Sequence, residues 1–291
     1  MTSESRRNES LRQIVAERRA AIVPGAADAL TARIIAELEF EAVYVTGAGL
    51  ANSYLGVPDL GLVTMTEVAQ HVAAIRSAVS LPLIVDADTG FGGPLNVRRT
   101  VELFELAGAN AIQLEDQPFP KRCGHFEGTA VVTADEMIQR IRAAVDARRD
   151  PNLTIIARTD ARTSFGLEEA LARAAIYQDA GADMTFVEAP HSGGELLRVA
   201  TTLQCPQVAN MVVGGSTPLV GQADLQGMGF ALVLYANVAL QAAALAVGQV
   251  LRGLREDGEI VKVDAVLSFE ERQRLLGKPY FDELEARYSH Q

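Results

Sequence analysis

The chain contains 291 residues, of which 48% are hydrophobic and 22% charged, a composition typical of a globular protein with a large core. Its net charge of −11 argues against a general nucleic-acid-binding surface, which would present a basic face. Two cysteines fit a reducing compartment better than a disulfide framework.

The first 20 residues are polar and rich in Arg and Glu, without the apolar core of a signal peptide. No uninterrupted apolar stretch has the length of a membrane span. Residues 230–250 come closest, but their Tyr, Asn, Gln and Ala content indicates a buried strand followed by a helix. We therefore expect a soluble cytoplasmic protein with no membrane and no nucleic-acid partner.

The predicted elements begin with a helix over residues 9–20, a strand over 21–25, and a helix that Asp28 caps and that runs to Leu38. A second strand covers residues 42–46. Helices and apolar strands then alternate, and the pairs are 66–79 with 83–88, 94–107 with 111–115, 135–148 with 154–160, and 167–180 with 184–188. Apolar runs over 207–213 and 231–235 bring the number of strands to eight.

This alternation predicts an α/β fold in which a parallel sheet closes into a (β/α)8 TIM barrel with an N-terminal helix; a doubly wound open sheet is the alternative. Polar residues end nearly every strand, which favours the barrel because its chemistry lies at the carboxyl ends of the strands. We expect one catalytic domain over residues 1–291. Residues 236–291 form a C-terminal helical extension, with helices over 238–255, 268–276 and 279–288, that packs on its own barrel or on a neighbouring subunit.

Four acids near these strand ends form a candidate metal site. Asp86 and Asp88 lie two residues apart, and hence on the same side of an extended strand, while Glu115 ends the next strand and Asp59 lies in a preceding loop. Mg²⁺ prefers oxygen ligands and retains several waters, so one direct carboxylate with the others acting through water would suffice. A solvated turn or a helix cap is the alternative for the Asp-x-Asp pair.

Two further strand ends are candidates for carboxylate binding. The backbone N–H groups of the segment Thr46-Gly47-Ala48-Gly49 can form an anion-binding nest, although the pattern is also that of an ordinary strand-to-helix turn. Arg158 ends an apolar strand, where its planar fork suits a carboxylate; a structural ion pair with Glu188 or another acid is the alternative.

The loop after Asp116 carries Lys121, Arg122, Cys123, Gly124 and His125. Neighbouring cations and an imidazole favour the thiolate of a cysteine, and glycine permits an irregular backbone beside it. The alternative is a small buried cysteine in a charged surface loop.

Together these segments resemble the isocitrate lyase and phosphoenolpyruvate mutase superfamily, especially its methylisocitrate lyase-like (2,3-dimethylmalate lyase-like) branch. The resemblance covers roughly residues 10–250. It is carried by Asp86-Ala-Asp88, Leu114-Glu-Asp-Gln117, Lys121-Arg-Cys-Gly-His125 and Ala157-Arg-Thr-Asp160 in this order.

The resemblance implies a Mg²⁺-dependent carbon–carbon lyase, with Mn²⁺ as a possible substitute, acting on a small carboxylate substrate within a homotetramer. It assigns Asp86 as the direct metal ligand and Asp59, Asp88 and Glu115 as acids holding its waters. Substrate would contact the segment Tyr44, Thr46, Gly47 and Ala48, as well as Arg158, Gly124, Asn210 and Thr217. Cys123 would be the general acid/base, supported by Lys121, His125 and Glu188, and either Tyr44 or a metal-linked acid would be the base.

Three positions depart from the pattern of methylisocitrate lyases. Val212 and Val213 stand where a Thr-Glu pair is usual, and Gln241 where an Arg is frequent. Because Val cannot replace polar contacts to an anion, we expect a substrate with fewer carboxylates or more alkyl groups, of which a 2,3-dimethylmalate-like acid is as plausible as 2-methylisocitrate.

Alternative functions on the same scaffold are oxaloacetate decarboxylation, C–C bond hydrolysis, and P–C bond chemistry. The last would use residues 214–217 as a phosphate nest. A noncatalytic metabolite-binding barrel is a further alternative.

Overall fold

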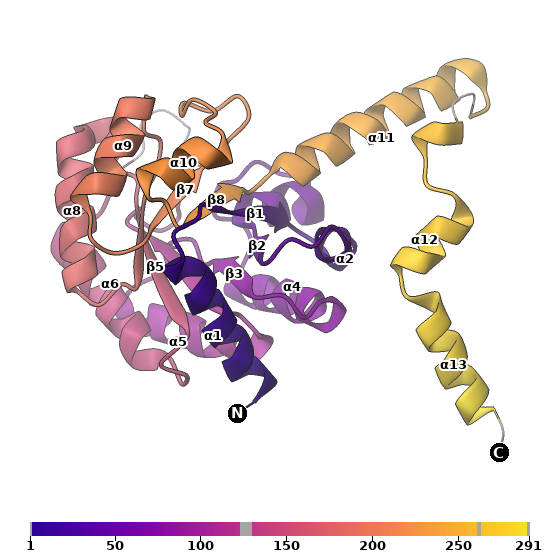
Figure 1. Ribbon diagram of the computed structural model, residues 1–291, viewed down its shortest axis with the longest axis horizontal. Coiled ribbons are helices and arrows are strands. Elements are labelled where there is room, and N and C mark those ends of the chain that lie inside the picture. The colour runs from indigo at the N-terminus through magenta and orange to yellow at the C-terminus, as the bar shows by residue number, and fades with distance from the viewer. Residues whose placement is uncertain (1, 123–129, 261–262, 290–291) are drawn as a thin grey trace.

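Eight parallel strands close into a barrel in the order β1 to β8, so that each strand pairs with its neighbour in sequence and β8 pairs with β1 (Figure 1). The structure is a computed structural model, and it describes residues 2–122, 130–260 and 263–289. The strands are β1 Ala21–Ala26, β2 Val43–Val45, β3 Leu83–Asp86, β4 Ala111–Glu115, β5 Thr154–Thr159, β6 Met184–Val187, β7 Gln207–Asn210 and β8 Leu232–Tyr235. The predicted (β/α)8 TIM barrel is thus confirmed.

Helix α1 precedes the strands, α2 to α10 follow them and surround the barrel, and α11 to α13 form the C-terminal extension. They are α1 Ser3–Ala16, α2 Ala29–Glu37, α3 Gly47–Leu50, α4 Met65–Ala78, α5 Pro94–Ala107, α6 Ala134–Ala147, α7 Ala161–Phe165, α8 Leu167–Asp179, α9 Gly193–Thr202, α10 Gln222–Met228, α11 Val238–Asp257, α12 Phe269–Leu275 and α13 Lys278–Tyr288. A π-helical segment, η1 Ala51–Leu55, continues α3, and a short 3-10 helix, η2 Val263–Ala265, precedes α12.

Local sequence signals account for several helix ends. Asp28 caps α2 as predicted, because its carboxylate accepts a hydrogen bond from Thr31 N at 2.8 Å. Thr64 and Glu67 form a capping box at the start of α4. Pro94 starts α5, and Gly108, with φ of +103°, ends it in the left-handed conformation that glycine adopts readily.

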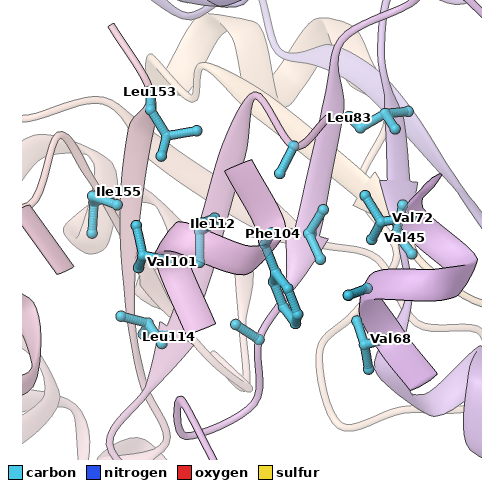
Figure 2. Packing of buried hydrophobic residues seen from close by; sticks show 14 of the residues in the cluster. Val45, Val68, Val72, Leu83, Val101, Phe104, Ile112, Leu114, Leu153 and Ile155 are labelled. Atoms are coloured by element: carbon cyan, nitrogen blue, oxygen red, sulfur yellow. The ribbon is translucent and has the colours of Figure 1, made fainter. Parts of the chain in front are cut away.

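Two apolar layers hold the barrel. The outer layer lies between strands and helices, where Val68 and Val72 of α4 and Phe104 of α5 face strand residues such as Val45 and Ile112 (Figure 2). The inner layer fills the barrel with alternate strand residues; these include Val23, Ile84, Ala111, Ile156, Phe186 and Leu234. Because the strands are short and buried on both faces, the apolar runs in the sequence mark them directly.

Helix α1 closes the amino-terminal end of the barrel. Its Leu11, Ile14 and Val15 belong to the inner apolar layer, as expected for a helix that covers one end of the core. Arg12 fixes the helix in place by donating to Asn152 O at 3.0 Å and to Asp183 Oδ1 at 3.0 Å. The carboxyl end of the barrel is therefore the end left for chemistry.

The C-terminal helices leave the barrel. Helix α11 projects away from it, and α12 and α13 follow at the edge of the molecule (Figure 1). None of the 20 residues of α11 is buried, and α12 contacts α2 through an ion pair between Arg274 and Glu37. Within the described ranges, no helix is both long enough and apolar enough to cross a membrane.

The predicted boundaries of most elements differ from the observed ones by one or two residues, and those of α5 and β4 coincide. The first helix begins at Ser3 rather than residue 9 because Thr2 caps it, accepting a hydrogen bond from Ser5 N at 3.1 Å. It ends at Ala16, four residues earlier than predicted, and Arg18 and Ala20 then adopt positive φ. Strand β7 ends at Asn210, so the residues after it belong to the following loop.

Candidate active site at the carboxyl end of the barrel

A small cavity opens where the carboxyl ends of the strands converge. Its volume is about 60 Å³, and residues from β2, β3, β5, β6, β7 and β8 and from the loops that follow them line it. The lining residues are Tyr44, Thr46, Ala48, Asp59, Asp86, Lys121, Arg158, Phe186, Glu188, Asn210, Val212, Leu234, Ala236 and Asn237. A larger hollow of about 420 Å³ lies beside Thr2 and Asp150 near α1, away from these strand-end groups.

Asp86 and Asp88 both face this region, but not through an extended strand. Strand β3 ends at Asp86, and Asp88 has a φ of +47°, so the expectation of a continuous extended strand was wrong. A tight turn replaces it, in which Asp88 N donates to Asp86 Oδ1 at 3.1 Å. A Cβ atom on Gly47 would lie 3.1 Å from Asp88 Oδ1 and 3.2 Å from Asp86 Oδ2, so the two carboxylates still meet at one place.

Lys121 lies between two of the predicted metal-site acids. Its Nζ is 2.6 Å from Asp59 Oδ2 and 3.0 Å from Asp88 Oδ1. Burial raises the pKa of Asp88 to about 7; Asp86 and Asp59 act in the same direction, while Lys121 opposes them. The loop that carries Lys121 is thereby tied to the metal-site acids.

Glu115 is the most isolated of the acids. It is 1% exposed, and neither carboxylate oxygen has a hydrogen-bond partner among the described residues. The nearest cation is Arg158, whose Nε lies 3.6 Å from Glu115 Oε2. Burial raises the pKa of Glu115 well above its usual value despite Arg158 and Lys121. An unpartnered buried carboxylate is a strong acceptor for a cation or its water.

Arg158 is paired with acids inside the barrel. Its Nη2 lies 2.7 Å from Asp160 Oδ1 and 3.3 Å from Glu188 Oε2, and its guanidinium lies 5.2 Å from the centre of the Phe186 ring. The alternative interpretation of Arg158, an ion pair with barrel acids, is therefore correct for the chain by itself. Since Arg158 also lines the cavity, carboxylate binding stays a prediction.

Glu188 directly follows β6 and lines the cavity. Its Oε1 accepts a hydrogen bond from Ala189 N at 2.9 Å, and its Oε2 accepts one from Asn210 Nδ2 at 3.2 Å. Asn210 Oδ1 is buried without a partner among the described residues. Asn210 thus keeps an acceptor in the wall of the cavity, where it was predicted to contact substrate.

Tyr44 lies in the cavity wall on β2 and is 2% exposed. Burial and the neighbouring Asp86 raise the pKa of its phenol well above the usual value. The phenol is therefore held in its protonated form. That state favours a hydrogen-bond donor over the general base that was one of the two expected assignments.

The segment after β2 is the strand-to-helix turn that was one of its two expected interpretations, and anion binding by its backbone stays a prediction. Thr46 caps α3 by accepting a hydrogen bond from Gly49 N at 3.1 Å, which makes the segment a strand-to-helix turn. Thr46 and Ala48 also line the cavity, and Gly47 packs against the carboxylates of Asp86 and Asp88. A side chain at position 47 would crowd those carboxylates.

The remaining wall of the cavity is apolar, formed by Phe186, Val212, Leu234 and Ala236. Val212 was expected to influence substrate choice, and it does line the cavity. Val213 is 50% exposed and Gln241 is exposed, and neither is among the lining residues. An influence of Val213 and Gln241 on substrate choice stays a prediction.

Gly47, Asp88 and Glu115 lie beside lining residues, and the other predicted site residues outside the lining fall into two groups. Thr217 is buried, with its hydroxyl unpartnered among the described residues, but it does not line the cavity. Cys123, Gly124 and His125 lie outside the described residues. Arg122, the last described residue before them, donates its backbone N–H to Gln117 Oε1 at 3.0 Å.

Sequence reasoning missed Asn237, which follows β8 and lines the cavity. Its Oδ1 accepts a hydrogen bond from the Thr46 hydroxyl at 3.0 Å. The available signal was its position directly after the eighth apolar strand, where the other strands end in polar side chains. Phe186 and Leu234 were treated only as strand residues.

Six acids surround the cavity and its rim, and we call them the acidic cluster. They are Asp59, Asp86, Asp88, Glu115, Asp160 and Glu188. Across the described ranges no three His, Cys, Asp or Glu side chains are arranged to hold a metal ion together. One direct carboxylate with waters held by the others, the arrangement usual for Mg²⁺, is compatible with this geometry, and the unpartnered Glu115 fits it.

Comparison with known proteins gives consistent matches over nearly the whole chain. The family described as phosphoenolpyruvate phosphomutase matches residues 11–255. The 2,3-dimethylmalate lyase of Eubacterium barkeri is 43% identical over 280 residues, which cover 96% of this chain and 97% of that protein. The 2-methylisocitrate lyase of Aeropyrum pernix is 42% identical over 248 residues, covering 85% of this chain and 80% of that one.

Solved structures match equally well. Oxaloacetate acetylhydrolase in complex with 3,3-difluorooxalacetate superposes with a TM-score of 0.93 and 33% identity, covering 99% of this chain and 98% of that one. Phosphonopyruvate hydrolase in complex with oxalate and Mg²⁺ gives a TM-score of 0.88 and 34% identity, with 99% of each chain covered.

Proposed function

Because the chain belongs to the phosphoenolpyruvate mutase/isocitrate lyase superfamily, we propose that it is a Mg²⁺-dependent carbon–carbon lyase. The substrate is a 2-hydroxy dicarboxylate or tricarboxylate of the 2,3-dimethylmalate or 2-methylisocitrate type. The products are pyruvate or a related 2-oxo acid and a second carboxylic acid. A 2,3-dimethylmalate-like acid is the better candidate of the two.

The mixture of charged and apolar side chains in the cavity lining carries this proposal. Asp86, Arg158 and Glu188 are charged lining residues, which suit the carboxylate and hydroxyl of a 2-hydroxy acid. Phe186, Val212 and Leu234 are apolar lining residues, which suit alkyl substituents better than a further carboxylate. Arg158 is the one arginine among the described lining residues, so one substrate carboxylate has a guanidinium partner there.

The reaction begins with binding of the substrate. Arg158 receives the carboxylate next to the hydroxyl-bearing carbon, and exchanges contacts with Asp160 and Glu188 for contacts with substrate. Tyr44, held as a phenol, donates a hydrogen bond to a substrate oxygen. When bound, Mg²⁺ supplies Lewis-acid polarisation of the hydroxyl and this carboxylate, and Asp86 with the waters on Asp59, Asp88 and Glu115 would hold it.

Bond cleavage is a retro-aldol-type step. A carboxylate of the acidic cluster accepts the proton of the 2-hydroxyl, and the bond between carbons 2 and 3 breaks as the carbonyl forms. The electron pair passes to carbon 3 and into the adjacent carboxylate, and carbon 3 then takes up a proton. The resemblance assigns that proton to Cys123, with Lys121 and His125 in support. For 2,3-dimethylmalate the products are pyruvate and propionate.

A second function is supported by a specific comparison. Oxaloacetate acetylhydrolase shares the fold at a TM-score of 0.93. Hydrolysis of oxaloacetate would release oxalate and acetate, whereas decarboxylation would release pyruvate and carbon dioxide. The apolar lining residues disfavour oxaloacetate, because that substrate carries no alkyl branch to contact them. P–C bond chemistry remains a third candidate on this scaffold.

A screen of purified protein with Mg²⁺ tests the proposal. The substrates are 2,3-dimethylmalate, 2-methylisocitrate, isocitrate, oxaloacetate and phosphonopyruvate, with both products identified by mass spectrometry. We expect cleavage of 2,3-dimethylmalate with the highest kcat/KM. Far better cleavage of 2-methylisocitrate would contradict the assignment of substrate, and oxalate from oxaloacetate alone would contradict the lyase.

One variant tests the role of the Cys123 thiol independently of metal binding. Cys123→Ser should lose lyase turnover while retaining Mg²⁺ binding. Unchanged turnover would remove Cys123 from the mechanism. Binding of these acids without turnover of any of them would instead indicate a noncatalytic barrel.

We also propose that residues 1–291 act as one catalytic unit that assembles into a homo-oligomer, namely a tetramer, in the cytoplasm. The exposed α11 supports assembly, because apolar side chains on it, including Leu245, Val247 and Leu251, lie in solvent in the single chain. The low cysteine content supports a reducing compartment.

A further inference from the structure

We propose that Asn237 is a positioning residue for the carboxylate-binding side of the cavity, acting through the hydroxyl of Thr46. The two residues are 191 positions apart in the chain, one after β2 and the other after β8. This inference deepens the proposed function. It rests on that function in one respect, namely that a substrate carboxylate binds in the cavity.

The Thr46 hydroxyl makes two hydrogen bonds, which use its one donor and one of its acceptor sites. It accepts one from Gly49 N at 3.1 Å and donates its proton to Asn237 Oδ1 at 3.0 Å. A hydroxyl normally rotates to suit its surroundings. Here Asn237 fixes its direction, and Thr46, which is 2% exposed, is held in one orientation in the cavity wall.

Asn237 accepts the hydrogen bond from Thr46 instead of capping the helix that it precedes. It is the N-cap residue of α11, where an asparagine side chain ordinarily accepts a hydrogen bond from the backbone of the first helical turn. Its side chain makes no such capping bond. The side-chain oxygen that could cap the helix is hydrogen-bonded to Thr46 instead. Capping of α11 therefore does not explain why an asparagine occupies this position.

The backbone of the same turn is held tightly against the barrel. A Cβ atom on Gly25 of β1 would lie 1.8 Å from the carbonyl oxygen of Ala236, so only glycine permits this approach. The turn that carries Asn237 is thus fixed relative to β1, which is paired with β2. A rigid turn of this kind can determine where the neighbouring Thr46 lies.

Both residues line the cavity with Asp86 and Arg158. Loss of the Asn237 side chain frees the Thr46 hydroxyl to rotate and leaves a polar group in the wall without its partner. The expected consequence is weaker binding of a carboxylate ligand, seen as a higher KM with a smaller change in kcat. A single hydrogen bond of this kind corresponds to a loss of about five- to tenfold.

Calorimetric binding of oxalate in the presence of Mg²⁺ tests the inference without relying on turnover. The variants are Asn237→Ala, Thr46→Val and the double substitution; Gln226→Ala, an exposed amide on α10, is the control. We expect Asn237→Ala to weaken oxalate binding about five- to tenfold in the wild-type background and to have no further effect in the Thr46→Val background. Asn237→Ser should behave as Asn237→Ala does, because serine caps a helix well but is too short to keep the bond to Thr46.

Thermal unfolding and Mg²⁺ affinity distinguish positioning from a structural role. For Asn237→Ser we expect both to match wild type while oxalate binding weakens. Wild-type oxalate affinity in Asn237→Ala, losses that multiply in the double variant, or a parallel loss of stability and Mg²⁺ binding in Asn237→Ser would each overturn the inference. Oxalate binding by wild type without cleavage of any 2-hydroxy acid would contradict the proposed function alone, whereas absence of oxalate binding would contradict both.

Discussion

Glu115 and Arg158 are paired neighbours on β4 and β5, yet their side chains do not form a close ion pair. The shortest distance joins Glu115 Oε2 to Arg158 Nε and is 3.6 Å, and the guanidinium is turned instead toward Asp160. Glu115 therefore keeps a buried carboxylate that is neither hydrogen-bonded nor closely neutralised within the described part of the chain. Such a group destabilises the metal-free protein.

Glu115→Gln should consequently stabilise the metal-free protein and impair Mg²⁺ binding. A neutral amide costs less to bury than a charge, so we expect a gain of about 1–3 kcal/mol in EDTA. Thermal unfolding with and without Mg²⁺ measures both effects. Glu102→Gln, at a half-buried position of α5 where the carboxylate pairs only with Arg98 of the same helix among the described residues, is the control and should change neither. A less stable Glu115→Gln variant that binds Mg²⁺ normally would contradict this role.

Tyr44→Phe should reduce kcat about 10²-fold, because it removes a buried donor from the cavity wall while keeping the ring. Steady-state formation of the 2-oxo acid measures the effect. Tyr54→Phe, at a position that is 51% exposed, should leave turnover unchanged. Comparable kcat for Tyr44→Phe and wild type would show that the phenol is dispensable.

Cys205 should react slowly with alkylating agents at neutral pH. Burial raises the pKa of its thiol above the usual value of 9.0, although Thr185 and Gln207 oppose the shift. Since the thiolate is the nucleophile, the alkylation rate in a Cys123→Ser variant should rise through pH 9 without reaching a plateau there. Iodoacetamide labelling followed by mass spectrometry gives the rate. In the control variant Cys205→Ser, the labelling rate measures the reactivity of Cys123 alone. A plateau in the alkylation rate of Cys205 below pH 9 would contradict the prediction.

Gly25→Ala should destabilise the fold by about 1–3 kcal/mol, because its Cβ would overlap the carbonyl oxygen of Ala236. Chemical denaturation measures the change in the free energy of unfolding. Gly193→Ala is the matched control, since no atom lies within 4 Å of a Cβ placed there. It should be neutral or slightly stabilising. Equal stability of both variants would mean that the turn at Ala236 is free to move.

Leu251→Glu should weaken the proposed oligomer. Val247, Leu251 and Leu254 follow helical spacing on α11, and Leu251 is 57% exposed in the single chain. A charge on this stripe would have to be buried in an interface. Light scattering coupled to size-exclusion chromatography should show a smaller particle than wild type. Gln249→Glu adds the same charge off the stripe and should assemble normally, and a monomeric wild type would contradict the proposal itself.

The fold could be predicted from sequence largely because local signals mark it. Short strands buried on both faces appear as apolar runs, and Gly108 ends a helix where the left-handed conformation is needed. Helix α9 was not predicted, since it begins with Gly193 and Gly194 and ends in two threonines, all poor helix formers. Packing of Leu196 and Val199 against the outer core stabilises it instead.

The part of the candidate site that could be predicted from sequence is the part that charged residue types at strand ends reveal. Acids and an arginine at strand ends pointed to one end of the barrel, and Asp86 and Arg158 do line one cavity. The left-handed turn at Asp88 was not predictable, because the backbone there follows from the hydrogen bond to Asp86 rather than from the residue itself. Asn237 was missed because its partner is Thr46, a contact that no local pattern encodes.

The composition of the acidic cluster has a consequence for the order in which ligands can enter. Six carboxylates surround a cavity that Lys121 and Arg158 alone offset within the described chain. A dianion approaching this wall meets a repulsive potential until a divalent cation reverses part of it. We therefore expect sequential addition, in which the cation binds first and the organic acid second.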